Sequence, residues 1–135
     1  MAVSNLLLRV SVSLLMLGLI LGIIMGIREN FLLAPAHAHL NLVGFVLMFA
    51  AGIYYRLMPE AAGGLLPRVQ AGLHIAGAIL FPGGLALMLG VDLRFGPLVV
   101  IGALIVLAAM ALFAVIVFRT TAAERAAQPA LSPAE

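Results

Sequence analysis

The chain contains no cysteine and no lysine, and charged residues make up only 9% of it. Without cysteine, it has no disulfides, no thiolate metal sites, no iron–sulfur clusters and no haem attached through cysteine. Its seven basic residues are all arginine and are scattered along the chain. Binding a phosphate backbone needs a basic patch or stripe, so we expect no nucleic-acid partner.

Hydrophobic residues make up 65% of the 135 residues, whereas a soluble domain has about 45–50% apolar and about 25% charged residues. This excludes a soluble globular domain and a disordered chain. Four charge-free runs, at 10–27, 31–55, 69–91 and 95–118, are each long enough to cross a bilayer, which takes about 20 apolar residues. We therefore predict an all-α integral membrane protein with helices at about 5–27, 35–57, 69–90 and 95–118.

The connections between these runs are short, and short connections favour antiparallel neighbours. They predict an up-down four-helix bundle that forms a single domain over 1–118, followed by a flexible cytoplasmic tail at 119–135. The first run has some features of a signal peptide, with small residues from Ala34 to Ala36 as a candidate cleavage site. It is longer than the about 7–15 residues of a signal core, so we expect it to be retained as a helix.

The arginines are distributed unequally between the two sides of the predicted bundle. Cytoplasmic segments carry an excess of arginine, so the side with five predicts cytoplasmic termini in a multi-pass protein of a bacterial inner membrane. The start of the second helix then faces outward, and Tyr54 and Tyr55, at its inner end, are typical of interface anchors. The five inner arginines are Arg9, Arg56, Arg68, Arg119 and Arg125, and the two outer ones are Arg28 and Arg94.

Gly18, Gly22 and Gly26 line one face of the first helix at four-residue spacing. Small residues let another helix approach closely in a membrane. The partner helix is either one of the same chain or one of a second copy in a homo-oligomer.

All three histidines lie in or at the edge of predicted spans, where ionisable residues are functional candidates. His37 and His39 follow Pro35 and are two positions apart, so on a regular helix their side chains diverge by about 200°. They cannot chelate one ion from the same face. A pair on opposite flanks favours two sites completed by other groups, and a haem on either flank fits, because each helix needs to supply only one imidazole.

Three further positions are candidates for a role at or near these two histidines. His74 is a further candidate metal ligand, with a hydrogen bond to a backbone carbonyl or to water as the alternative. The span ends put it about 20 Å from His39 along the membrane normal, too far to share one iron. Asn41, one turn below His37, could orient an imidazole or make an interhelical hydrogen bond. Gly44 leaves room for a planar ring or for a neighbouring helix.

The second span resembles the tenth helix of subunit I of the haem–copper oxidases, the family of the cytochrome c oxidases and nitric oxide reductases. The resemblance rests on residues 36–45 (AHAHLNLVGF) and 52–59 (GIYYRLMP). It implies that His37 ligates a high-spin haem and His39 a low-spin haem, on opposite flanks. The family's subunit has three four-helix arcs, and this chain is one arc long, without the histidine pair that holds the family's copper. Small four-helix membrane proteins named for their likeness to this subunit are also similar.

These observations favour a b-type haem protein for electron transfer or for binding oxygen or nitric oxide, with His37, His39, Asn41 and Gly44 at the haem. The single arc favours a homo-oligomer, a trimer or a dimer, in which two copies ligate each haem, with a respiratory electron-transfer partner. One alternative is copper or zinc bound by His37, His39 and Glu29, since imidazole suits both metals. The other is a cofactor-free structural partner of an oxidase. The incomplete centre favours a non-enzyme, with oxidoreductase chemistry if there is any.

Overall fold

The computed structural model describes the backbone of residues 2–127 and the side chains of residues 2–122. Over these residues it is helical, without strands. Four helices are long and apolar enough to cross a membrane: Val3–Ile27, Ala34–Leu57, Leu66–Gly90 and Leu93–Ala122. The prediction of an all-α protein with four helices long and apolar enough to cross a membrane is therefore confirmed.

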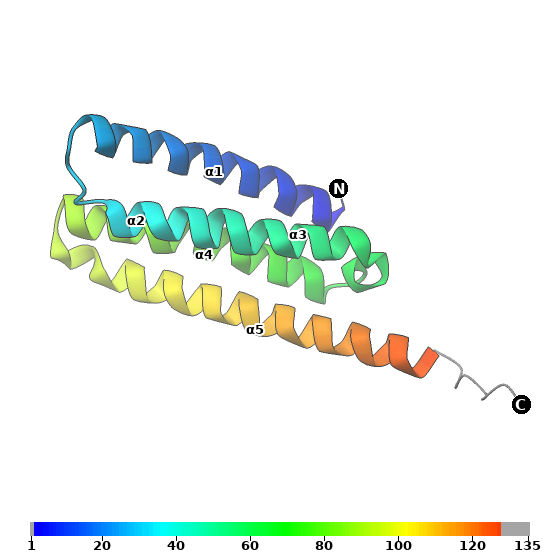
Figure 1. Ribbon diagram of the computed structural model, residues 1–135. Helices are drawn as coiled ribbons and strands as arrows, with labels where there is room; N and C mark the ends of the chain where they lie inside the picture. Colours follow the sequence, from blue (N-terminus) through cyan, green and yellow to red (C-terminus); the bar gives the residue numbers. More distant parts are fainter. Residues whose placement is uncertain (1, 128–135) are drawn as a thin grey trace, which may run out of the picture.

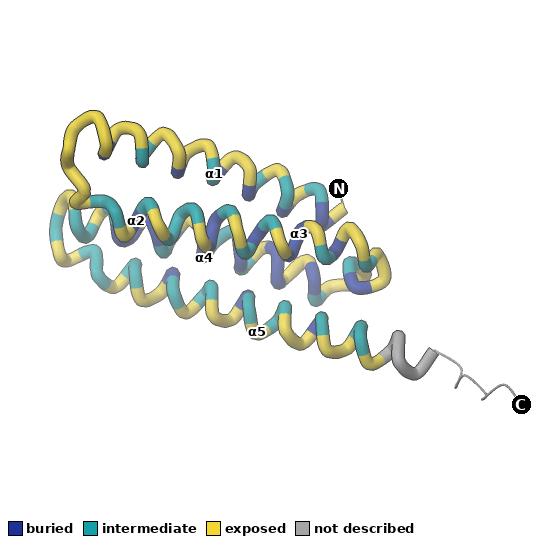
Figure 2. Tube along the Cα trace, viewed as in Figure 1, coloured by how far each residue is buried: buried dark blue, intermediate teal, exposed yellow. Residues whose placement is uncertain are grey.

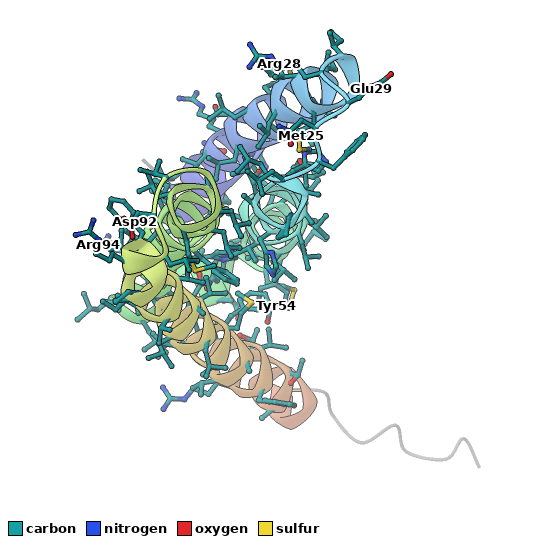
Figure 3. All side chains as sticks on the ribbon, turned by 90° about the vertical axis from the view of Figure 1, so that its left-hand side faces the viewer. Met25, Arg28, Glu29, Tyr54, Asp92 and Arg94 are labelled. Atoms are coloured by element: carbon teal, nitrogen blue, oxygen red, sulfur yellow. The ribbon has the colours of Figure 1, made fainter. Side chains whose placement is uncertain are left out.

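The second span lies in front of α4 (Leu66–Gly90), and α1 (Val3–Ile27) and α5 (Gly96–Ala127) flank this central pair (Figure 1). Helix α1 packs on the second span, the second span packs on α4, and α5 packs mainly on α4. Viewed from one end, α1 and α5 lie on opposite sides of the central pair (Figure 3). The N-terminus and the C-terminal end of α5 lie at the same end of the bundle (Figure 1).

Burial follows this arrangement. Buried residues gather where the second span meets its neighbours, and exposed residues cover the outer faces of α1 and α5 (Figure 2). The largest fully buried side chains include Leu7, Met48 and Tyr55. Many large hydrophobic side chains are exposed, as is suitable for a surface in contact with lipid. Between α4 and α5 the backbones approach closely at Gly102, where a Cβ atom would lie 2.5 Å from the Phe81 nitrogen.

The second span changes helix type along its length. It begins as an α-helix, α2 (Ala34–His39), with Pro35 in the first turn, where its missing N–H is not needed. It continues as a π-helix, η1 (Leu40–Leu47), and ends as α3 (Met48–Leu57). π-Helical segments are rare and are frequently found at functional sites. The two histidines therefore lie in regular α-helix directly before a π-helical segment.

Two predicted boundaries differ from the structure. Helix α4 begins at Leu66, three residues before the predicted start at 69, because Pro67 fits the first turn of a helix. The short 3-10 helices η2 (Pro59–Ala62) and η3 (Leu93–Phe95) lead into α4 and α5. Helix α5 continues to Ala127, so the predicted tail from 119 starts as helix, and 128–135 lie outside the described residues.

Candidate functional site

The two histidines of α2 lie against different neighbours. His37 reaches α1, where its Nδ1 lies 2.9 Å from the backbone oxygen of Gly18. His39 lies against α4, where its ring centroid is 4.5 Å from that of Phe81. The pair thus uses two flanks of one helix, in line with the divergence expected from its spacing.

His37 has one ring nitrogen in a hydrogen bond to α1 and a polar side chain against its ring. The Nδ1–H donates to the Gly18 carbonyl at 2.9 Å, and the amide nitrogen of Asn41 lies over the ring, 3.2 Å from Nε2 and 3.4 Å from Nδ1. The glycines of α1 make room for this arrangement. A Cβ on Gly22 would lie 2.8 Å from Cε1 of His37, and one on Gly18 would overlap the Asn41 amide. His37 and Asn41 therefore fasten the second span to α1, and the His37 ring is packed against both the Asn41 amide and Gly22.

Two of the three glycines on one face of α1 take part in this contact with the second span. Gly18 and Gly22 pack against the second span of the same chain, whereas a Cβ on Gly26 would meet nothing within 4 Å among the described residues. The within-chain alternative accounts for Gly18 and Gly22.

His39 has one ring nitrogen engaged. Its Nδ1–H donates to the carbonyl of Pro35, one turn earlier, over 2.7 Å. Its Nε2 makes no hydrogen bond within the part of the chain that the structure describes. A metal-binding histidine usually donates its other N–H to a carbonyl or carboxylate, which fixes the tautomer and the ring orientation. His39 has this arrangement, and the lone pair of its Nε2 is left to bind a metal ion.

His74 is fully buried and lies in a chain of polar side chains. Its Nε2 donates to the Val43 carbonyl in η1 at 3.1 Å, and its Nδ1 faces the Gln70 amide at 3.5 Å. Gln70 in turn accepts from the hydroxyl of Tyr55 at 3.1 Å. The alternative of a backbone hydrogen bond therefore describes His74, and neither ring nitrogen is left for a metal.

The depth difference between His39 and His74 is smaller than predicted. His39 packs on Phe81, which follows His74 by seven residues on α4, or about 10 Å along the helix axis. The figure of about 20 Å took the start of the charge-free run as the membrane surface, whereas α4 begins earlier and its register is set by packing. About 10 Å is still too far for two ligands of one iron.

Asn41 and Gly44 both face α1. Asn41 contacts the His37 ring, and its Oδ1 is buried without a hydrogen-bond partner among the described residues. A Cβ on Gly44 would lie 3.0 Å from Leu14, so Gly44 accommodates a neighbouring helix. Asn41 thus supports His37, and the space at Gly44 holds a side chain of α1.

Sequence reasoning missed the role of Gln70 and misassigned Tyr55. Tyr55 is only 2% exposed and bonded to Gln70, and its ring packs on Phe113 of α5 with centroids 5.9 Å apart. The interface-anchor interpretation of Tyr55 is therefore wrong. The signal was available at Gln70, because an uncharged polar residue four positions before His74 shares its helix face.

The described residues of one chain do not form a metal site by themselves. Over the described residues there is no group of three or more His, Cys, Asp or Glu side chains that could hold an ion. Glu29 lies in the exposed loop after α1, with a φ of 48°, and points away from Arg28 (Figure 3). Copper or zinc bound by His37, His39 and Glu29 would need ligands from a second molecule.

In comparisons with known proteins, no family model, curated sequence or solved structure matched the chain.

Proposed function

We propose that this protein is a b-type haem-binding protein of the bacterial inner membrane and that His39 is the axial ligand. In this proposal the four spans form an up-down bundle with both termini in the cytoplasm. The unequal distribution of the arginines supports that orientation. The resemblance of the second span to the His-x-His helix of the haem–copper oxidases supports the choice of haem.

The observation that carries the proposal is the bonding of His39. Its Nδ1–H is held by the Pro35 carbonyl at 2.7 Å, so the lone pair of the neutral ring is on Nε2. Phe81 packs against the ring and restricts its rotation. The Nε2 of His39 has no hydrogen-bond partner in the described part of the chain, whereas the His37 ring is packed against the Asn41 amide and Gly22 of α1, so His39 fits an imidazole ligand better than His37 does.

A bound haem would supply one-electron transfer or binding of a small gas such as oxygen or nitric oxide. The hydrogen bond from Nδ1–H of His39 to the Pro35 carbonyl would hold the imidazole in one tautomer and make its Nε2 a stronger ligand for the iron. His74 is too far from His39 and is bonded to Val43, so a second protein ligand must come from another molecule. A dimer with two His39 side chains on one iron meets this condition without breaking the His37 contacts.

Absorption spectra of the full chain test this proposal. The protein is expressed with excess haem and purified in mild detergent, and oxidised and dithionite-reduced spectra are recorded with the haem-to-protein ratio. We expect bound haem in the wild type and in His37→Ala, and loss of haem in His39→Ala. In His39→Gly, added imidazole should restore the spectrum, which a purely structural role for His39 would not produce.

The matched histidine variants also define failure. A colourless wild type despite haem supply refutes haem binding, and loss of haem in His37→Ala with retention in His39→Ala refutes the ligand assignment.

The second candidate is a cofactor-free structural partner of an oxidase. It is favoured by His74, whose ring nitrogens both face partners within the chain, and by His37, whose ring is held against α1 and Asn41. Metal analysis of a colourless protein would separate it from a copper or zinc protein.

A further inference from the structure

An apolar groove runs between α1 and α4 on the membrane-facing surface. It encloses about 380 Å³ and is open on one side, and the second span forms its floor. Its walls include Leu14 and Leu21 of α1, Ile79 and Gly83 of α4, and Ala36 and Leu40 of the second span. His39 does not line it, so the groove is separate from the proposed haem ligand.

The groove continues toward the end of the bundle that carries the loop after α1. A second cavity of about 160 Å³ shares Leu21 and is lined further along by Met25, Arg28 and Gly90. The two cavities together follow α1 from Leu14 to Arg28, which is about 21 Å along the helix axis. One leaflet of a bilayer core is about 15 Å deep, so this length covers one leaflet and its interface.

Charge is confined to the interfacial end of the groove. Arg28 is exposed and forms no ion pair within the described residues, and the Glu29 side chain points away from it (Figure 3). The deeper lining is entirely apolar. A Cβ on Gly83 would meet nothing within 4 Å, so the groove is open to an external chain at this position.

We infer that this groove binds one anionic phospholipid, with an acyl chain along Leu14 to Leu21 and the phosphate at Arg28. The apolar walls match a hydrocarbon chain, and the length matches a single leaflet. The arginine at the mouth selects a negative headgroup. A helix of a second copy would fill an apolar groove as well, but it gives no reason for an unpaired arginine at its interfacial end.

Native mass spectrometry of the full chain in detergent tests this inference. The protein is titrated with phosphatidylglycerol and with phosphatidylcholine of the same acyl chains, and the bound fraction is read from the lipid adducts. We expect tighter binding of phosphatidylglycerol, and we expect Arg28→Gln to weaken that binding about fivefold while leaving phosphatidylcholine unchanged. Arg94→Gln is the matched control, because Arg94 is on the same side but is paired with Asp92.

A second pair of variants tests the acyl-chain part. Gly83→Leu fills the groove and should weaken binding of both lipids, whereas Gly26→Leu, which also meets no neighbour within 4 Å, lies outside the groove and should not. Circular dichroism checks that each variant is folded. Equal binding of the two lipids by the wild type, or equal loss in Gly83→Leu and Gly26→Leu, overturns the inference. A dimer that binds no lipid and dissociates in Gly83→Leu assigns the groove to a second copy instead.

Discussion

Replacing each of the three glycines of α1 by alanine separates close packing from helix propensity. The three positions have the same spacing, but a Cβ at Gly18 would overlap Asn41, and one at Gly22 would lie 2.8 Å from His37. At Gly26 there is nothing within 4 Å in the described part of the chain. The same substitution should therefore have opposite signs along one helix.

The magnitudes follow from three contributions. Alanine is favoured over glycine in a helix by up to about 1 kcal/mol. Overpacking costs about 1–3 kcal/mol, and losing an interhelical hydrogen bond in a membrane costs about 0.6 kcal/mol on average. Gly26→Ala should therefore stabilise by up to about 1 kcal/mol, and Gly18→Ala should destabilise by about 1–3 kcal/mol, because displacing Asn41 breaks its contact with His37. Gly22→Ala should fall between them, because the His37 ring can turn.

Reversible unfolding in mixed detergent and dodecyl sulfate micelles, followed by circular dichroism, measures these differences. The wild type and the three variants are compared at the same protein-to-detergent ratio. If Gly26→Ala destabilises as much as Gly18→Ala, the reasoning is refuted, because Gly26 would then pack against something outside the chain. That result would support the homo-oligomer alternative for the glycine face.

Three further outcomes are expected. Tyr55→Phe removes the donor to Gln70 and should destabilise by about 0.6–1.7 kcal/mol in the same unfolding assay. Gly102→Leu should separate α4 from α5 and lower the melting temperature more than Gly26→Leu, because a Cβ at Gly102 would meet backbone atoms. Asp92 is the only aspartate, and its hydrogen bonds from the Arg94 side chain and backbone lower its pKa. Carboxyl NMR should show that Asp92 stays ionised to a lower pH than an ordinary aspartate and that Arg94→Gln raises its pKa. The contribution of the Asp92 carboxylate to stability should therefore be lost only as the pH falls through this lowered pKa.

The sequence was sufficient for the spans and for the directions of the first two histidines. Hydropathy alone locates four helices, and helix geometry alone separates His37 from His39. The sequence was insufficient wherever the burial or bonding of a side chain depends on how neighbouring helices are aligned along their axes. Tyr55 next to a charged residue has the pattern of an interface anchor, and only its position opposite Gln70 makes it a buried hydrogen-bond donor. The π-helical segment has no signal in hydrophobic periodicity, because apart from Asn41 its residues are apolar side chains or glycine, as in an ordinary membrane helix.

The number of histidines overstates the number of ligands that one chain offers. All three imidazoles are in spans, but the His37 ring is held by the Gly18 carbonyl and the Asn41 amide, and the buried polar chain uses both nitrogens of His74. Of the three, only His39 has an Nε2 without a polar neighbour in the described part of the chain. One ligand per chain links coordination to assembly in the proposed haem protein. If haem is bound, a monomer would supply only His39 and would suit gas binding, whereas a pair of chains would supply two imidazoles and would suit electron transfer. The spin state of the bound haem would therefore report the oligomeric state, and the two measurements should agree on one sample.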